Sequence, residues 1–395
     1  MRVLVLAPHP FYQERGTPID VDILVRALSA REGTTVDLLV YGEGEDHAYE
    51  NVTLHRIADL RLLRGVRPGF SAKKLLADLL LFWKARALLR EHRYDVIHAG
   101  EEAAFLALFF RRVHGIPFVY DLDSSVAQQM VESRPALAFL GRALGALEGW
   151  AISRAIATAP VCNALADLCR SRGAAKVVTL HDISQLADPD APRSGALRRE
   201  VGSERLLLVY AGNLEPYQGI DLLLESFARA AARSDAVDLV VIGGVPEDVA
   251  HYRRKAEALG LAGRAHLIGP RPFQELDRYL ADADVLVAPR IRGVNTPMKV
   301  FPYLHSGRPV LVTDLPTHAQ ILTDEVAYLA PPTVEGFGDA IVELAENASL
   351  RERLGRAGRA FVERDHTFAA HRRRVDALYD WVEQEIARER GLAGP

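Results

Sequence analysis

Short apolar runs alternate with longer amphipathic segments along the chain. Most of these runs are hydrophobic at consecutive positions, which is typical of strands buried on both faces of a parallel sheet. The pattern predicts strands in the first half of the chain at residues 3–7, 35–41, 95–99, 117–121, 155–159 and 176–181. It predicts strands in the second half at residues 206–211, 237–242, 265–268, 284–288, 309–313 and 326–329. Because strands and helices alternate and the series runs twice, we expect an α/β fold of two facing Rossmann-like domains, each a parallel sheet with helices on both faces.

A linker-like segment separates the two series of predicted strands. Residues 188–195 contain two prolines and a glycine among charged residues, a composition that favours an interdomain linker. The sequence therefore predicts an N-terminal domain over residues 1–190, a second domain over residues 200–365 and a charged C-terminal helix within residues 366–395. Two open sheets that face each other bring the carboxyl ends of their strands to one cleft, where ligands of such sheets bind.

Composition narrows the classes of function. The chain has 395 residues and a net charge of −4, which gives no overall reason to expect nucleic-acid binding. Its two cysteines, Cys162 and Cys169, lie about two helical turns apart, so we interpret them as reduced, buried thiols rather than as a disulfide. The first apolar run is shorter than that of a signal peptide, and no stretch approaches the ~18 apolar residues that span a bilayer. We therefore expect a cytoplasmic protein.

The loops that follow predicted strands carry the candidate chemistry. Residues 9–19 lead from the first strand into a helix, and Gly16 in this loop allows an anion to approach the free N–H groups of that helix. The neighbouring Arg15 would add positive charge, although an ordinary connecting loop explains the same residues. The G-x-G-x-x-G pattern of dinucleotide-binding dehydrogenases is missing here, which argues against an oxidoreductase.

Two segments of the second half resemble a known family. In residues 210–227, YAGNLEPYQGIDLLLESF, a strand runs through a glycine loop into a helix. Residues 284–290, DVLVAPR, lead through 295–304, NTPMKVFPYL, to 306–311, SGRPVL. Both segments resemble the donor-binding domain of the retaining glycosyltransferases of family four, whose twin-Rossmann fold is called GT-B.

This resemblance implies a nucleotide-diphosphate sugar as donor, retention of anomeric configuration, no metal or redox cofactor, and a last helix that packs back on the first domain. The sequence departs from the family where members usually hold the donor. Asn213 and Gln218 stand in place of an arginine and a lysine, and Val294 and Pro302 stand in place of two glutamates. Gly100 replaces the usual active-site histidine of the first domain.

The remaining polar groups predict where the donor binds. Lys299 lies at the start of a predicted helix, whose dipole already favours an anion, and Arg290 lies in the preceding loop. Asn295 and Thr296 can cap this helix or bind a sugar hydroxyl. A plain helix cap and a solvated lysine are the alternative interpretations. The predicted donor-binding residues are Gly16, Gly212, Asn213, Arg290, Asn295, Thr296 and Lys299.

Acidic residues stand at two predicted strand ends of the first domain. Glu101, next to Glu102, follows the strand at 95–99, and Asp121 ends the next strand, two residues before Asp123. A carboxylate there can orient an acceptor hydroxyl or take its proton, so we predict Glu101 and Asp121 as catalytic residues. Balancing of a helix dipole or structural capping explains them without catalysis. The D-x-D spacing also resembles a metal motif, but an octahedral site needs further ligands, and we predict no metal.

Residues 56–93 are strongly basic. Ten lysines and arginines stand against three acidic residues, with leucines, phenylalanines and a tryptophan between them. This combination favours contact with an anionic membrane surface, so we predict peripheral attachment to the inner face of a membrane. A helix that packs on the sheet and turns a basic face to solvent is the alternative.

The sequence thus predicts a glycosyltransferase that moves a sugar from a nucleotide-diphosphate donor to a glycan, a lipid-linked molecule or a small molecule. A nucleotide-sugar epimerase or phosphorylase of the same fold is one alternative. A non-catalytic sugar-binding protein, which has lost the usual glutamates and histidine, is the other.

Overall fold

The computed structural model describes residues 1–13, 16–66, 71–127 and 138–391. The chain forms two compact units. Unit 1 contains Met1–His181 together with Phe368–Pro395, and unit 2 contains Asp182–Thr367. The proline-containing segment 188–195 belongs to unit 2, where the Asp282 carboxylate accepts hydrogen bonds from the backbone N–H groups of Gly195 and Leu197.

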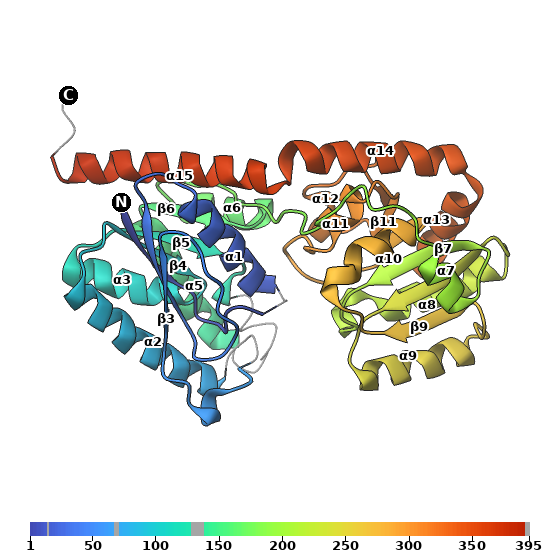
Figure 1. The fold of residues 1–395 in the computed structure, drawn as a ribbon, viewed down its shortest axis with the longest axis horizontal. Coiled ribbons are helices and arrows are strands. Elements are labelled where there is room, and N and C mark those ends of the chain that lie inside the picture. The colour runs from blue at the N-terminus through green and yellow to red at the C-terminus, as the bar shows by residue number, and fades with distance from the viewer. Residues whose placement is uncertain (14–15, 67–70, 128–137, 392–395) are drawn as a thin grey trace. The chain divides into compact units, whose positions relative to one another are not determined.

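Unit 1 is built on a six-stranded parallel sheet in the order β3-β2-β1-β4-β5-β6 (Figure 1). Its strands are β1 (Arg2–Leu6), β2 (Thr35–Val40), β3 (Val52–Arg56), β4 (Val96–Gly100), β5 (Phe118–Leu122) and β6 (Ala157–Pro160). Its helices are α1 (Gly16–Ser29), η1 (Arg61–Leu63), α2 (Ala72–Glu91), α3 (Ala103–His114), α5 (Ala138–Arg154), α6 (Asn163–Ser171) and α15 (Phe368–Glu389).

Unit 2 repeats the arrangement with a parallel sheet in the order β12-β11-β10-β7-β8-β9. Its strands are β7 (Leu206–Ala211), β8 (Val237–Ile242), β9 (Ala265–Gly269), β10 (Val285–Ala288), β11 (Val310–Thr313) and β12 (Tyr328–Ala330). Its helices are α7 (Ala196–Val201), η3 (Pro216–Gln218), α8 (Ile220–Ala231), α9 (Pro246–Ala258), η4 (Phe273–Glu275), α10 (Leu276–Asp282), α11 (Val300–His305), α12 (Pro316–Ala319), α13 (Val334–Glu346) and α14 (Ala348–Asp365).

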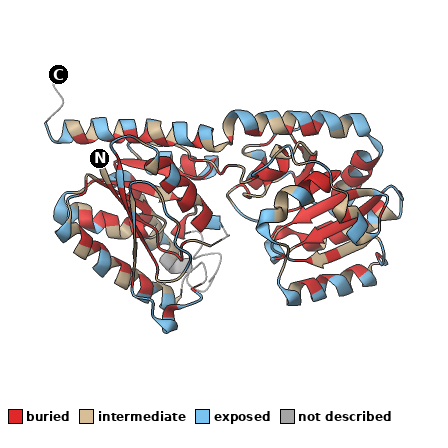
Figure 2. Cartoon of the chain, in the orientation of Figure 1, coloured by how far each residue is buried: buried red, intermediate tan, exposed pale blue. Residues whose placement is uncertain are grey.

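The predicted fold class is confirmed, because each unit is a doubly wound parallel sheet with strands buried on both faces (Figure 2). Two strand predictions are wrong. Residues 176–181 form only an isolated bridge, between Val177 and Thr158. β3 was not predicted because it is a half-buried edge strand, and its sequence, VTLHR, has none of the continuous apolar character of the central strands.

The predicted C-terminal helix is α15, which is part of unit 1 and packs on α1. Its apolar stripe of Val375, Leu378 and Val382 joins the core cluster that covers one face of the unit 1 sheet. On its outer side, Asp380 and Glu383 accept hydrogen bonds from Arg31, which follows α1. Two elements distant in sequence are thereby held on one sheet face.

In both units the strand order reverses beside the first strand of the sheet. The reversal lies between β1 and β4 in unit 1, and between β7 and β10 in unit 2. Ligands of open α/β sheets bind outside the carboxyl ends of the strands at this switch point. The loops after β1, β4, β7 and β10 are therefore where the site is built.

Candidate functional site

The loop after β7 and the segment before α11 meet at the switch point of unit 2. Tyr303 of α11 fixes the end of β7, because its hydroxyl donates to the carbonyl of Ala211 (2.7 Å) and accepts from the N–H of the same residue (2.6 Å). Gly212 follows with φ 155°, and a Cβ there would lie 2.4 Å from Lys299 Nζ. Glycine is thus required for the lysine to lie against the backbone of this loop.

Lys299 is a cation with neutral partners. Its Nζ donates to the Tyr210 hydroxyl (2.7 Å) and to Gln218 Oε1 (3.1 Å), and lies 4.1 Å from the centre of the Tyr210 ring. Within the described residues no carboxylate forms an ion pair with it. Burial, together with the charge of Arg290, lowers the pKa of Lys299 to about 7. A bound anion would reverse this shift by favouring the protonated amine.

Arg290 supplies the second positive charge of this site. Its guanidinium lies 5.2 Å from the centre of the Tyr217 ring, and its Nε donates to the Arg292 carbonyl (2.6 Å). The carbonyl of Arg290 accepts from Thr313 Oγ1 (2.5 Å) at the end of β11. The backbone of the loop after β10 is therefore anchored to the neighbouring strand.

The alternative interpretation of Asn295 and Thr296 as a plain helix cap is wrong. α11 begins at Val300, its N-cap residue is Lys299, and no side chain caps it. The Asn295 carbonyl instead accepts from Thr317 Oγ1 (2.7 Å). Thr296 Oγ1 is buried and has no hydrogen-bond partner among the described residues. This leaves a polar atom that a ligand hydroxyl can satisfy.

His318, in the short helix that follows β11, is buried. The sequence pattern did not predict this residue as part of the site. Its Nδ1 lies 2.9 Å from the Thr313 carbonyl, so this nitrogen carries the proton. Burial lowers the pKa of His318 to about 4, which keeps the ring neutral at physiological pH. Its helix, α12, comprises only Pro316–Ala319, which is too short for an apolar periodicity that would predict the burial of His318.

In unit 1, Glu101 and Asp121 are neighbours at the carboxyl edge of the sheet, as predicted from the strand ends. Gly100 pairs with Asp121 in the ladder between β4 and β5, and the Glu101 N–H donates to the Asp121 carbonyl (3.0 Å). Glu101 has φ 46°, a left-handed conformation that is uncommon for a residue with a side chain. Such conformations cluster at functional sites.

Glu101 belongs to a cluster of acidic groups around one lysine. Lys74 of α2 lies 2.5 Å from Glu102 Oε1 and 3.9 Å from Glu101 Oε2. Although burial opposes the effect, Glu102 and Glu101 raise the pKa of Lys74. Burial, followed by the charge of Glu102, raises the pKa of Glu101 to about 7 and that of Asp78 to about 7. A carboxyl group that titrates near neutral pH suits general acid–base catalysis.

Two charged residues of the basic segment 56–93, Lys74 and Asp78, point toward the sheet and not to the surface. The buried residues of α2 are Ala77, Leu81, Ala85 and Leu88, a stripe with helical spacing. Lys74 extends this stripe by one turn toward the N-terminus of the helix, and Asp78 lies within it, between Ala77 and Leu81. Helical periodicity would therefore have revealed that both side chains point inward.

A chain of hydrogen bonds through His98 and Tyr379 orients the Asp121 carboxylate. Its Oδ2 lies 3.1 Å from Nε2 of His98, and Nδ1 of His98 lies 2.9 Å from the Tyr379 hydroxyl of α15. Because a carboxylate only accepts, Nε2 carries the proton, and in the neutral ring Nδ1 accepts from the tyrosine. The His98 side chain is 1% exposed, so this chain of hydrogen bonds is enclosed in the core.

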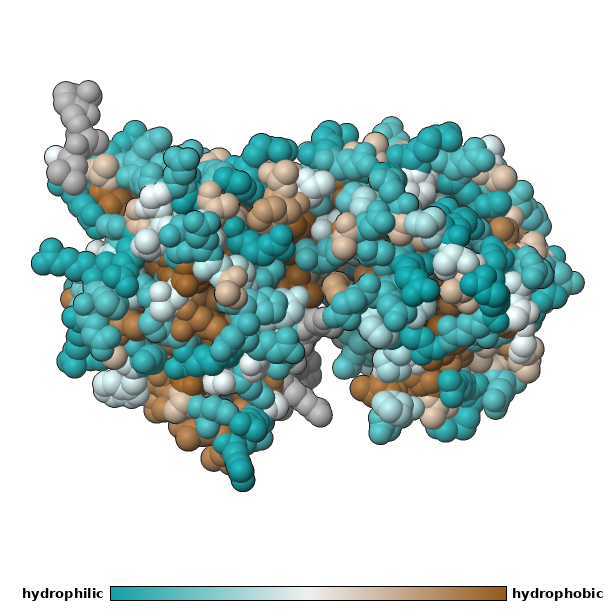
Figure 3. Space-filling model, viewed as in Figure 1, coloured by the Kyte–Doolittle hydropathy of each residue, from teal (hydrophilic) through white to brown (hydrophobic). Residues whose placement is uncertain are grey.

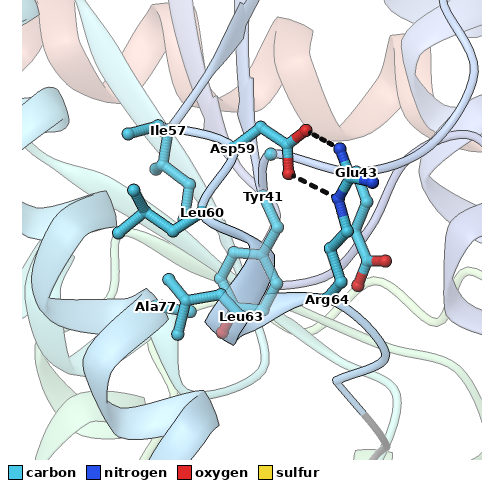
Figure 4. A pocket seen from close by; sticks show the side chains of 10 residues that line it. Tyr41, Glu43, Ile57, Asp59, Leu60, Leu63, Arg64 and Ala77 are labelled. Atoms are coloured by element: carbon cyan, nitrogen blue, oxygen red, sulfur yellow. Dashed lines mark hydrogen bonds and ion pairs between the residues drawn. The ribbon is translucent and has the colours of Figure 1, made fainter.

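A small pocket lies beside the acidic cluster, between the end of β2, the segment after β3 and η1 (Figure 4). Ile57, Leu60 and Leu63 give it an apolar lining, and the Asp59–Arg64 ion pair lies at its polar side. Tyr41 also lines it, and the Tyr41 hydroxyl donates to Asp78 Oδ1 (2.5 Å). Tyr41 thus connects the pocket to the acidic cluster through a hydrogen bond.

The remaining predicted residues have less definite surroundings. Gly16 is exposed at the start of α1, and a Cβ there would meet nothing within 4 Å, so packing within the chain does not demand glycine. Arg15 lies outside the described residues. Asn213 borders the lysine site, because its carbonyl accepts from the Tyr210 hydroxyl (2.5 Å). Within the described ranges, no group of three or more histidine, cysteine or acidic side chains is arranged to hold a metal ion.

Comparison with known proteins gives matches on both units. The model of Glycosyltransferase Family 4 matches residues 16–187, and the model of Glycosyl transferases group 1 matches residues 205–347. The D-inositol 3-phosphate glycosyltransferase of Kribbella flavida is 27% identical over an aligned length of 370 residues, and the match covers 86% of this chain and 81% of that protein. The phosphatidyl-myo-inositol mannosyltransferase of Mycobacterium leprae is 30% identical over 152 residues, 38% of this chain and 40% of the relative. The chain thus matches two fifths of that enzyme's length.

Solved structures resemble the whole chain at low sequence identity. Sucrose-phosphate synthase from Thermosynechococcus elongatus has a TM-score of 0.77 and 18% identity, and the match covers 97% of this chain and 99% of that one. Anabaena HepE, solved in complex with UDP, has a TM-score of 0.74 and 14% identity, with 96% and 100% covered. At these identities the likeness establishes the fold.

Proposed function

Because the chain belongs to the glycosyltransferases of family four and has their GT-B fold, we propose that it transfers a sugar from a nucleotide-diphosphate donor with retention of anomeric configuration. Unit 2 binds the donor, and unit 1 binds the acceptor. No redox cofactor takes part, and positive charge stabilises the negative charge that develops on the leaving group.

The observation that carries the donor assignment is the uncompensated cation at Lys299. A buried ammonium group with only neutral partners is costly unless a counter-charge arrives. Gly212 keeps the adjacent backbone open to a ligand, and Arg290 adds a second positive charge. A diphosphate supplies the counter-charge that Lys299 lacks, and the positive charge of the site stabilises it as a leaving group when the glycosidic bond to the donor breaks.

In unit 1 we assign the acceptor to the groups at the ends of β4 and β5. Glu101 titrates near neutral pH and takes the proton of the acceptor hydroxyl. Asp121, oriented by His98, holds this hydroxyl or a neighbouring one in place. These roles need only the two carboxylates and no metal.

Three similar proteins support the substrate classes. One HepE structure contains UDP, and another contains UDP-glucose. The names of the two sequence relatives contain an inositol phosphate in one case and a phosphatidylinositol in the other. For this chain we propose a nucleoside diphosphate sugar as donor, and a hydroxyl of a carbohydrate or lipid-linked molecule as acceptor.

The donor assignment is tested by titrating UDP and GDP into wild type and Lys299→Ala in a calorimeter. Loss of a charged hydrogen bond of about 1.5–3 kcal/mol predicts that affinity for the preferred nucleotide falls about tenfold or more. Lys255→Ala is the matched control, because this lysine of the same unit forms ion pairs with Asp221 and Glu225. Equal affinity in wild type and Lys299→Ala, with both proteins folded, would remove the diphosphate from this site.

A further inference from the structure

One face of unit 1 exposes an unusual number of apolar side chains. Among the described residues, large hydrophobic side chains are exposed at fourteen positions, and eight of these lie on or beside η1, α2 and α3. We call these eight the apolar face. Its members are Leu60, Leu62, Leu75, Leu76, Leu79, Trp83, Phe109 and Val113.

The apolar face is continuous from one helix to the next. On α2, Leu76, Leu79 and Trp83 follow at helical spacing on the side opposite to the buried stripe of Ala77, Leu81, Ala85 and Leu88. Phe82 connects α2 to α3, because its ring lies 5.3 Å from that of Trp83 and 5.5 Å from that of Phe109. Figure 3 shows hydrophobic side chains (brown) gathered at the edge of unit 1 where α2 lies in Figure 1, with hydrophilic ones (teal) beside them.

The charges around this face are positive and largely uncompensated. Lys73, Lys84 and Arg90 are exposed on α2, and Arg112 is exposed at the end of α3. None of the four forms an ion pair with a described residue. Of the three acidic residues in 56–93, Asp78 points into the core and Asp59 is paired with Arg64, which leaves Glu91 as the remaining exposed acid beside these cations.

We propose that the apolar face and its flanking cations bind the surface of an anionic lipid bilayer. Apolar side chains among lysines and arginines are the composition of a helix that lies in a membrane interface. In the described ranges no helix combines the length and apolar content that a bilayer crossing needs, so the attachment is peripheral. The choice of a lipid-linked acceptor rests on the proposed function, whereas the membrane contact itself does not.

A second copy of the chain fits this face less well than a bilayer does. A two-fold dimer places the same patch against itself, so the cations of the two copies would face one another. Anionic headgroups, in contrast, pair with the cations while the leucines and Trp83 enter the acyl boundary. Charge complementarity therefore favours lipid.

The test is co-sedimentation of the full chain with phosphatidylglycerol–phosphatidylcholine vesicles and with pure phosphatidylcholine vesicles. We expect binding to the anionic vesicles at low salt and about fivefold weaker binding for each cation removed in Lys84→Gln and Arg90→Gln. Binding should weaken at high salt because screening shortens the range of the attraction. Arg353→Gln, an exposed residue of unit 2, is the charge control.

The apolar contribution is tested with tryptophan variants of similar exposure. Trp83 is 57% exposed in the apolar face, and Trp150 of α5 is 49% exposed outside it. Brominated lipid should quench fluorescence that Trp83→Phe removes and Trp150→Phe keeps. Negligible binding to anionic vesicles at low salt, or equal quenching in both variants, overturns the proposal. A dimer in solution that Trp83→Ser dissociates overturns it as well, in favour of a second copy. UDP titration of the same variants tests the proposed function separately, since a failure there leaves the vesicle result untouched.

Discussion

Both units place a lysine at the switch point of the same strand order, but the surroundings of the two lysines are opposite. In unit 1, Lys74 lies among Glu101, Glu102 and Asp78, which raise its pKa. In unit 2, Lys299 has a tyrosine and an amide as partners, and burial lowers its pKa to about 7. The shared topology determines where a ligand can bind, and the local charges determine which ligand binds there. We therefore expect an anion to bind at Lys299 of unit 2 rather than beside the carboxylates of unit 1.

The largest effect is expected from removing the titrating carboxylate of unit 1. Glu101→Gln keeps the shape of the side chain but cannot accept a proton, so turnover should fall about 10²-fold or more if Glu101 is the base. Affinity for UDP should hardly change, because we assign the donor to unit 2. Steady-state transfer assays and nucleotide titrations of the same preparation measure both. Loss of nucleotide affinity with normal turnover would exchange the roles that we assign to the two units.

The next largest effect is expected in the pH dependence of donor binding, because the pKa of Lys299 is lowered whereas that of Lys74 is raised. Between pH 7 and about 9 the free protein loses the Lys299 proton, since its pKa is depressed to about 7, whereas a bound diphosphate favours the protonated form. Nucleotide affinity should therefore be steady below pH 7 and fall by up to about tenfold per pH unit above it.

Lys299→Arg is the control for this pH dependence, because a guanidinium remains charged throughout the range. Its affinity should be nearly independent of pH between 7 and 9, whatever its absolute value. An equally flat profile in wild type would mean that Lys299 is not the titrating partner of the diphosphate.

The smallest effect is expected from the positioning chain behind Asp121. Tyr379→Phe removes the hydroxyl that donates to His98, so the imidazole is held less firmly and Asp121 is oriented less well. Loss of a neutral hydrogen bond of about 1 kcal/mol predicts a fall of about fivefold in kcat/KM for the acceptor.

Donor affinity should be unchanged in this variant, and the split between KM and kcat for the acceptor is the informative measurement. A positioning role requires acceptor kinetics to change more than donor binding. If Tyr379→Phe only lowers the melting temperature, the hydroxyl serves packing of α15 and not the site.

The sequence by itself determined the fold class, most of the strands and which residues lie at the carboxyl ends of the strands. Continuous apolar runs such as 206–211 have no stable place except inside a parallel sheet, so their assignment needed no tertiary information. Glu101 and Asp121 could be predicted as neighbours because parallel strands end at one edge. The half-buried edge strand β3 escaped this reasoning, since its pattern resembles that of a polar loop.

Only the tertiary structure decided which charges are compensated. Lys74 lies in the first turn of α2 and Lys299 at the N-cap position of α11, so local sequence does not distinguish them. The distinction arises from partners distant in the chain, which are Glu101 and Glu102 for Lys74 and Tyr210 and Gln218 for Lys299. The same is true of His98 and Tyr379, which are 281 residues apart and meet because α15 packs on unit 1. A pKa depends on burial and on charges within a few ångströms, and neither is a property of the local sequence.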